Sequence, residues 1–415
     1  MIYSLRTNLR SRPQWQLTLI VIFFAQLISA VGFSIIFPFL PLYVQELGSS
    51  GGLSVEFWSG MVFAIPGVTM MFAAPVWGAL ADRHGRKMMV IRAMFGGTIL
   101  IFLMGHVQTV EMLVLLRAAQ GLITGTVSAN NALIAATAPR NRVGFAMGTI
   151  QVGLWAGIAV GPLIGGTLAD AFGFRLPFIV TALLMSLAGV LVWMFVKEEF
   201  VPTEEMRQAR GGFISDWRHI LSMPGVPLLF VIRFMTGLNR TLIIPIAPLF
   251  IQSLHGGDSG VSTLTGLMVG LSSAGATATA IYLGRLGDRI GHRPILIVSA
   301  LVAAIAYFPQ TFVTETWQLL TLQALAGAAT GGLISSPSAL LARYTEPGEE
   351  GSVYGLDNSI VAGSRALAPL IGSLIAVSLG LRFTFMATGL LFLLVVVIAV
   401  RWLPGTDPVP RPETA

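Results

Sequence analysis

The sequence predicts an all-α membrane protein with twelve transmembrane helices in two pseudo-symmetric six-helix bundles around a central cavity. Hydrophobic residues make up 54% of the 415-residue chain and charged residues only 11%, with a mean hydropathy of +0.79. A soluble domain has about 25% charged residues, so this composition excludes a soluble fold. Two further observations support the prediction: twelve apolar runs are long enough to cross a bilayer, and the second half of the chain repeats the first.

Each apolar run is close to or longer than the roughly 20 residues that a helix needs to cross the hydrocarbon core. The runs cover residues 17–44, 57–81, 88–106, 110–138, 143–171, 175–197, 225–253, 264–286, 294–313, 316–343, 352–379 and 382–403. A charged stretch separates six runs from six. We therefore expect an N-terminal bundle over 1–197, a cytoplasmic linker over 198–222, a C-terminal bundle over 223–404 and a cytoplasmic tail over 405–415. Within the linker, residues 213–221 have the pattern of a short amphipathic helix.

The distribution of basic residues predicts the orientation of the chain in the membrane. Of the 25 Lys and Arg residues, only Arg175 and Arg382 fall on one side, and four lie inside runs. The remainder lie on the side that carries both termini. Basic residues accumulate in cytoplasmic loops, so both termini should be cytoplasmic in a multi-pass protein of the cell inner membrane. The same topology explains the sequence pI of about 10.1 without a nucleic-acid partner.

The chain aligns with itself at an offset of 206 to 207 residues, as from Gly121 to Gly327 and from Pro41 to Pro248. The charged stretch 78–90 recurs at 284–296 in the same way. An even number of spans per half gives both halves the same orientation, so an axis along the membrane normal relates them. Paired bundles of this kind transport by alternating access, with the halves rocking around a site at mid-depth.

The repeated charged stretch forms a cytoplasmic corner between the second and third helices of each half. The candidate hinge residues are Gly78, Asp82, Arg83, Gly85, Arg86, Lys87, Asp288 and Arg289. Glycine permits a tight turn and close helix approach, and a carboxylate can accept bonds from a helix N-terminus. A conformational latch is the favoured reading, and a simple positive-inside anchor is the alternative.

The fifth helix carries glycines four residues apart at 153, 157, 161 and 165, followed by Gly166. One helix face therefore lacks side chains, so that another backbone can approach closely, and Pro162 removes a backbone donor. Helix eleven repeats the pattern with Ser364, Ala368 and Gly372. We expect a sliding contact between the two halves, with packing inside one bundle as the alternative.

Charged and polar side chains inside the spans mark a candidate substrate cavity, because such residues rarely face lipid. Arg233 and Arg240 lie seven residues apart on one face of helix seven. The candidate cavity residues are Gln26, Phe33, Phe37, Asn131, Gln151, Trp155, Arg233, Asn239, Arg240, Asn358 and Arg365. Arg117 lies inside the fourth span and should face a cavity or a partner, or else extend to the outer interface.

Asp357 is the only carboxylate clearly inside a span. It could carry a proton, or it could form a latch with Arg83 or Arg86 of the first hinge, or it could be a solvated residue at a helix end. The latch is favoured because Asp357 lies toward the cytoplasmic end of its helix. Arg365 is eight residues further on, about 12 Å along the axis, and is not expected to pair with it.

Several stretches resemble the major facilitator superfamily over essentially the whole chain. GALADRHGRK at 78–87 is similar to its loop motif, and LLRAAQGLITG at 115–125 to its fourth-helix motif. GIAVGPLIGG at 157–166 resembles the antiporter motif, through Gly157, Gly161, Pro162, Gly165 and Gly166. The segments FPFLPLYVQELG, WSGMVF and ANNALIAATAPRNR resemble MdtG-type multidrug exporters of the twelve-span drug:proton antiporter family.

The resemblance implies proton-coupled efflux of small amphipathic compounds, with Arg117 taking part in proton coupling. Asp357 is the second candidate for proton coupling, because of its position inside a span. The expected partners are a small-molecule substrate, protons and membrane lipid, and the expected state is a monomer. A narrow exporter of a sugar or organic anion is the alternative, and a non-transporting scaffold is a further one. No phosphate-binding GxxxxGK[ST] stretch, metal-ligand spacing or nucleophile–base pair stands out in the sequence. We therefore expect no enzyme activity, metal or cofactor, with the proton gradient as the energy source.

Overall fold

The structure is a computed structural model that describes residues 14–48, 51–139, 142–198, 220–223, 225–344 and 350–404. Within these residues the chain forms helices and no strands, which confirms the predicted all-α fold. Twelve helical segments are long and apolar enough to cross a membrane, and they coincide with the predicted apolar runs. Most of the predicted linker, its amphipathic helix at 213–221 and the tail at 405–415 lie outside the described residues.

The first six spans form the N-terminal bundle. Its helices are α2 (Gln14–Ile35), α3 (Leu40–Leu47), α4 (Val55–His84), α5 (Arg86–Met104), α6 (Val110–Ile123), α7 (Thr126–Thr137), α8 (Val143–Phe172) and α9 (Arg175–Phe195). The first span is interrupted between α2 and α3, where Pro38 and Pro41 remove backbone donors. The fourth span is interrupted between α6 and α7, where Gly125 has a φ of +121° that favours glycine.

The last six spans form the C-terminal bundle. Its elements are α12 (Val226–Leu242), α13 (Ala247–His255), α14 (Val261–Ile290), α15 (His292–Tyr307), the 3-10 helix η2 (Phe308–Phe312), α16 (Thr316–Tyr344), α17 (Glu350–Leu379) and α18 (Leu381–Arg401). The break between α12 and α13 repeats the one between α2 and α3, with Pro248 at the first turn of the second piece. The internal repeat read from the sequence is therefore a structural repeat.

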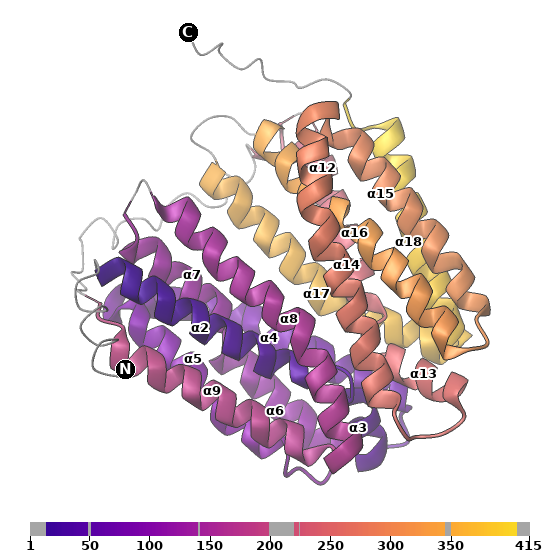
Figure 1. Cartoon of the computed structure of the whole chain (residues 1–415), viewed down its shortest axis with the longest axis horizontal. Helices are drawn as coiled ribbons and strands as arrows, with labels where there is room; N and C mark the ends of the chain where they lie inside the picture. Colours follow the sequence, from indigo (N-terminus) through magenta and orange to yellow (C-terminus); the bar gives the residue numbers. More distant parts are fainter. Residues whose placement is uncertain are drawn as a thin grey trace, which may run out of the picture.

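Each bundle has its own buried core, and the two bundles occupy separate halves of the molecule (Figure 1). In the N-terminal bundle, Phe39 and Phe178 pack edge to face with ring centroids 5.5 Å apart. In the C-terminal bundle, Phe250 and Phe385 pack at 4.8 Å. These aromatic contacts lie inside a bundle, whereas Leu42 of α3 packs into the core of the C-terminal bundle and links the two.

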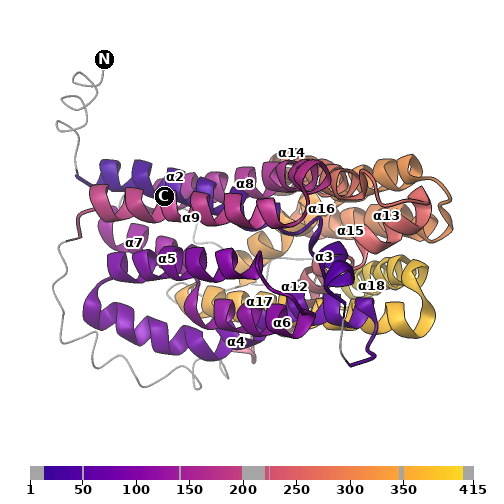
Figure 2. The same cartoon turned by 90° about the horizontal axis from the view of Figure 1, so that it is seen from below.

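Two long helix pairs join the bundles, α8 packed on α14 and α4 packed on α17, and the short helices α3 and α13 also contact each other (Figure 2). Gly166 of α8 lies against Ser262 of α14, and a Cβ atom on Gly60 of α4 would be 2.7 Å from Cβ of Ser373 on α17. Both contacts lie toward the ends at Val55, Phe172, Val261 and Leu379, which the sequence predicts to face outside and which are called the outer ends below. Figure 1 shows the halves meeting there and splaying apart at the opposite ends.

Candidate functional site

The site lies where the two bundles face each other, a surface called the central face below. On its C-terminal side, Arg233 of α12 binds Asp357 of α17 through two hydrogen bonds, from Nε to Oδ1 at 2.6 Å and from one terminal nitrogen to Oδ2 at 2.5 Å. Asp357 is 3% exposed. In this arrangement, with the inner ends apart, a bidentate partner inside the same bundle occupies the carboxylate, so the predicted latch between Asp357 and Arg83 or Arg86 is not formed here and stays a prediction for the opposite arrangement.

Two further arginines lie on this side of the central face. The Arg240 guanidinium of α12 lies over the Trp155 ring of α8, 5.3 Å from its centroid, and so reaches across to the other bundle. Arg365 of α17 is within electrostatic range of Arg240 and Arg233. The side chains of Arg240 and Arg365 are exposed, and neither donates a hydrogen bond or pairs with a carboxylate within the described residues. The expectation that Arg365 does not pair with Asp357 is confirmed, because Asp357 binds Arg233.

On the N-terminal side, Arg117 of α6 is only 2% exposed, which excludes the alternative in which it extends to the outer interface. Its Nε donates to the Val62 carbonyl oxygen at 3.0 Å, and a terminal nitrogen donates to Oε1 of Gln120 at 2.8 Å. The guanidinium also lies 5.9 Å from the Phe63 ring centroid. Arg117 thus has polar and aromatic partners, and its assignment to proton coupling stays a prediction.

An aromatic row continues from Phe63 across the N-terminal bundle. Phe63 packs on Phe37 with centroids 5.8 Å apart, and Phe37 packs edge to face on Phe33 at 5.3 Å. Phe33 is 40% exposed. The predicted pair Phe33 and Phe37 therefore lies together on one surface, as the helix spacing indicates.

Two residues predicted for the cavity are buried and unavailable to a ligand in this arrangement. Gln26 is 3% exposed, and its Oε1 accepts from the Asn130 side chain at 2.5 Å. Asn239 is fully buried in the C-terminal bundle. The expectation that these two side chains face the cavity is therefore wrong in this arrangement, because neither is accessible to a ligand. Asn131 and Gln151 are half-buried and Asn358 is exposed, and their role in binding stays a prediction.

The first hinge fastens two helices of the N-terminal bundle. The backbone N–H groups of Arg86 and Lys87 donate to the two carboxylate oxygens of Glu198 at 2.9 and 2.7 Å. Lys87 Nζ also donates to the Trp193 carbonyl oxygen at the end of α9, at 2.9 Å. Glu198 therefore caps α5, where the helix dipole favours an anion. The sequence missed this residue because it follows α9, far from the hinge motif.

The second hinge makes the equivalent contacts in the other bundle. Arg293 donates to the carbonyl oxygens of Ala399 and Val400 at the end of α18, at 3.2 and 2.8 Å. Arg293 and Ala399 occupy the repeat positions of Lys87 and Trp193. Each hinge thus holds the third helix of its bundle to the sixth, which explains why the stretch occurs twice.

Only some hinge residues have the predicted role. Gly85 and Gly291 adopt φ values of +88° and +95°, so the turn requires glycine. Gly78 has open space around it, and the expected close helix approach there is wrong. Arg83 and Arg289 are exposed, and Asp288 accepts from the His292 ring at 3.1 Å when that nitrogen carries the proton. The side chain of Asp82 lies outside what the structure describes.

The glycines at 153, 157, 161 and 165 of α8, called the glycine ladder below, pack inside their own bundle. A Cβ atom on Gly157 would come within 2.6 Å of Ala30 Cβ, and Gly161 and Gly165 lie against Ser34 and Ile35, all on α2. The predicted sliding contact between the halves is therefore wrong for these glycines, and the packing alternative is right. Gly166 and Pro162 differ, because they contact Ser262 and Gly266 of α14 across the two bundles.

A carboxylate closes the outer end of the same helix pair. Asp170 of α8 accepts from the backbone N–H groups of Ser262 and Thr263 at 3.2 and 2.7 Å. These groups lie in the first turn of α14, whose N-cap residue Gly260 has no side chain to satisfy them. The sequence shows a carboxylate, Asp170, at the outer end of the helix that carries the antiporter-like motif. It does not show the partner of this carboxylate, because Ser262 lies 92 residues further along the chain.

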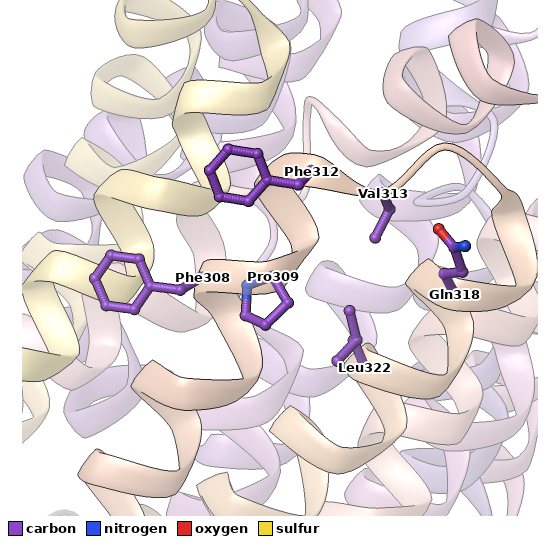
Figure 3. Close-up of a pocket in the computed structure, with 6 residues that line it drawn as sticks. All are labelled: Phe308, Pro309, Phe312, Val313, Gln318 and Leu322. Atoms are coloured by element: carbon purple, nitrogen blue, oxygen red, sulfur yellow. The ribbon is translucent and has the colours of Figure 1, made fainter.

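In the part of the chain that the structure describes, no metal site is indicated, and a hollow lies in the C-terminal bundle. Within the described residues, no group of three His, Cys, Asp or Glu side chains could hold a metal ion. A hollow of about 530 Å³ is lined by Phe308, Pro309, Phe312, Val313, Gln318 and Leu322 (Figure 3). It lies between η2 and α16 of one bundle, and therefore away from the central face.

Two repeated bundles that meet at their outer ends around a charged central face define a membrane transporter of the two-bundle type. The sequence model described as Major Facilitator Superfamily matches residues 22–232 and 229–415. The chain belongs to the Major Facilitator Superfamily, as the motif resemblance implied.

Named relatives agree with this assignment. The multidrug resistance protein MdtG of Serratia proteamaculans (strain 568) is 37% identical over 382 residues, covering 91% of this chain and 92% of that protein. MdtG of Salmonella paratyphi A (strain ATCC 9150 / SARB42) is 36% identical over 377 residues, covering 90% and 92%.

A solved structure shows the same fold. The bacterial homologue of the human lysosomal transporter Spinster, in an inward-facing and unoccupied conformation, superposes with a TM-score of 0.78 at 15% identity. The match covers 95% of this chain and 98% of the other. At this identity the likeness concerns the fold alone.

Proposed function

We propose that this protein is a proton-driven exporter of structurally varied small amphipathic compounds in the cell inner membrane, with both termini in the cytoplasm. The relatives named as multidrug resistance proteins support the substrate breadth. The halves of one chain complete the central face, so a monomer is sufficient. Transport requires no covalent chemistry, cofactor or metal.

The observation that carries proton coupling is the buried pair of Arg233 and Asp357. Among the described residues, Asp357 is the carboxylate that lies more than one turn from either end of its helix. A proton that binds an Asp357 oxygen removes the negative charge and weakens both hydrogen bonds from Arg233. Since α17 also packs on α4 of the other bundle, a change at Asp357 can reach the contact between the bundles.

The proposed cycle uses this pair in both directions. With the outer ends closed, Asp357 is ionised, binds Arg233, and has released its proton toward the cytoplasm. With the outer ends open, a proton from outside binds Asp357 and frees the guanidinium. The compound leaves to the outside while the outer ends are open. The protonated protein then closes its outer ends and carries the proton inward, so one compound leaves for each such closure.

The proposal is tested with purified protein in liposomes that contain a trapped pH indicator. A compound gradient should drive proton movement in the opposite direction, and choline should replace sodium without effect. A mixed panel of anionic, neutral and cationic fluorescent amphiphiles also separates broad efflux from the narrow alternative. Sodium dependence, or uphill transport that survives an uncoupler, would contradict proton drive. The absence of any transport would favour the alternative of a non-transporting scaffold.

A further inference from the structure

The central face carries positive charge that no carboxylate of the described residues neutralises. Arg233 is balanced by Asp357, but Arg240 and Arg365 have no carboxylate partner within the described residues. They are close enough to each other to repel. We propose that Arg240 and Arg365 form a binding site for the anionic group of an amphipathic organic anion, whose flat apolar part packs beside Trp155. This inference rests on the proposed export function and specifies its substrate class.

The depth of the two arginines shows that they face a hydrated interior. Arg240 lies near the middle of the span Val226–His255, and Arg365 near the middle of Leu356–Leu379. Both side chains are nevertheless exposed. A charge at this depth is too costly to face lipid, so exposure here means contact with water between the bundles.

The packing of α17 gives the direction of Arg365. Ser364 on one flank packs on Gly237 of α12, and Ala366 on the other flank packs on Gly67 of α4. Leu374, nine residues on and therefore on the opposite side of the helix, is 68% exposed and apolar, as a lipid-facing residue is. Arg365 thus points between α12 and α4, toward the central face.

The chemistry of the cluster selects a ligand with two parts. Each guanidinium presents planar N–H donors that match a carboxylate, phosphonate or sulfonate, and Arg forms such bonds even in water-poor sites. Trp155 belongs to the other bundle and already holds Arg240 over its ring at 5.3 Å. A flat apolar group can pack on the exposed part of this indole while its anionic group binds the arginines. A ligand held in this way contacts both halves.

The site is tested by direct binding, with two probes that share one ring system. Anilinonaphthalene sulfonate is the anion, and phenylnaphthylamine lacks the sulfonate and is neutral. The full-length protein is held in phosphatidylcholine nanodiscs, and the variants are Arg240→Gln, Arg365→Gln, Arg240→Lys and Trp155→Ala. Arg401→Gln is the matched control, because it removes one exposed arginine at the end of α18 in the same bundle.

We expect each central Arg→Gln change to raise the Kd of the sulfonate about tenfold or more, the usual cost of losing a bond to a charged group. The neutral probe should be unaffected, and Arg401→Gln should change neither probe. Arg240→Lys should weaken the sulfonate less than Arg240→Gln does, because it keeps the charge but loses the planar donors. Trp155→Ala should weaken both probes. Equal weakening of both probes by Arg240→Gln, or an unchanged sulfonate Kd, would overturn the proposal.

Two further comparisons complete the test. One distinguishes a lipid phosphate from a small organic anion at the site, and the other distinguishes this inference from the proposed function. If lipid phosphate occupies the site, phosphatidylglycerol nanodiscs should weaken sulfonate binding several-fold, and that result would overturn a small organic anion as the ligand. The binding test does not depend on coupling. A protein that binds the sulfonate selectively but moves no protons contradicts only the proposed function, whereas proton-driven efflux without sulfonate selectivity contradicts only this inference.

Discussion

At the scale of single residues, the ion pair of Arg233 and Asp357 dominates the central face. Its two hydrogen bonds join α12 to α17 within one bundle, and the carboxylate is almost fully buried. Removal of one member of a buried pair typically costs about 3–5 kcal/mol, because the other charge stays buried without a partner. The pair is therefore a structural link and, through its carboxylate, the proposed proton carrier.

Replacement of Asp357 by Asn should separate coupling from transport. Asn keeps the size and one acceptor oxygen but cannot bind or release the proton. We expect uphill efflux to stop while downhill exchange of a compound persists, as measured in the same liposomes with and without a proton gradient. Asp258→Asn, at an exposed outer position where Asp258 accepts from Gln252, is the control and should retain coupling. Intact uphill efflux in Asp357→Asn would exclude this carboxylate as the carrier.

The double variant Arg233→Gln and Asp357→Asn tests the pair itself. Either single change leaves an unpaired charge or an unpaired donor, whereas the double change removes both charges. We expect thermal stability to be lower in each single variant and largely restored in the double variant, with a coupling free energy of about 0.5–3 kcal/mol. Uphill efflux should not return. Additive losses of stability would show that the two residues do not act as a pair.

Sequence reasoning placed Arg233 and Asp357 in the interior but could not pair them. They are 124 residues apart, and helix spacing gives the face of a residue on its own helix, not the neighbour of that face. The same limit explains Gln26 and Asn239, which the helix spacing placed toward the cavity but which are buried, Gln26 against Asn130 of its own bundle. The charge and depth of a residue were predictable, whereas its partner required the packing of the helices.

At the scale of helices, close packing by small residues recurs in both halves. The α8 glycines admit the α2 backbone, and on α17 Ser364 and Gly372 lie against Gly237 and Leu242 of α12. The repeat therefore preserves a helix pair as well as a sequence pattern. Both pairs stay within a bundle, so their function is to hold each bundle rigid.

Leucine on the ladder should damage the bundle itself. At Gly157 a new side chain would collide with Ala30 and the adjacent α2 backbone, and overpacking of this kind costs about 1–3 kcal/mol. We expect Gly157→Leu or Gly161→Leu to abolish transport and lower the melting temperature while the chain still inserts. Gly148→Leu on the same helix meets open space and should behave as the parent protein does. Normal stability and transport in Gly157→Leu would show that the packing is loose.

The helix boundaries show which breaks a sequence can reveal. Prolines predict irregular backbone. The first span of each half breaks beside a proline, Pro41 in the N-terminal half and Pro248 at the repeat position in the C-terminal half. The break in the fourth span was not predicted, because Thr124 and Gly125 interrupt an otherwise continuous apolar run. Trp77 of α4 satisfies one freed carbonyl there, donating from Nε1 to Leu122 at 2.5 Å. That stabilisation depends on another helix, so it leaves no local signal.

At the scale of the whole molecule, the two bundles are joined at their outer ends by contacts of different kinds. Backbone packing at Gly166 and Gly266 brings α8 and α14 together, and the Asp170 carboxylate closes their ends. The equivalent ends of α4 and α17 have no such carboxylate bridge within the described residues, and Ser54 caps α4 locally. The closed outer arrangement therefore depends more on one helix pair than on the other.

Leucine at Gly166 should shift the conformational balance and leave the bundles intact. Its side chain would meet the Ser262 backbone of the other bundle, so the strain is relieved when the outer ends separate. We expect greater labelling, by a membrane-impermeant maleimide from outside, of a cysteine introduced at Ala159, which lies against Gly270 across the same contact. The melting temperature should fall less than in Gly161→Leu. Unchanged labelling would mean that the contact does not control opening.

The same measurement tests Asp170, which bonds two N–H groups at the start of α14 and also meets the positive end of its dipole. Asp170→Asn keeps one acceptor oxygen but loses the charge and one of the two bonds. A helix cap contributes about 0.5–2 kcal/mol, and each 1.4 kcal/mol is tenfold in a population, so outside labelling at Ala159 should rise several-fold. The chain has no native cysteine, which removes background labelling. Asp258→Asn lies on the same outer surface and does not bridge the bundles, so its labelling should match the parent protein. If labelling rises equally in both variants, surface charge and not the bridge sets the balance, whereas a rise confined to Asp170→Asn identifies this carboxylate as the contact that holds the outer ends closed.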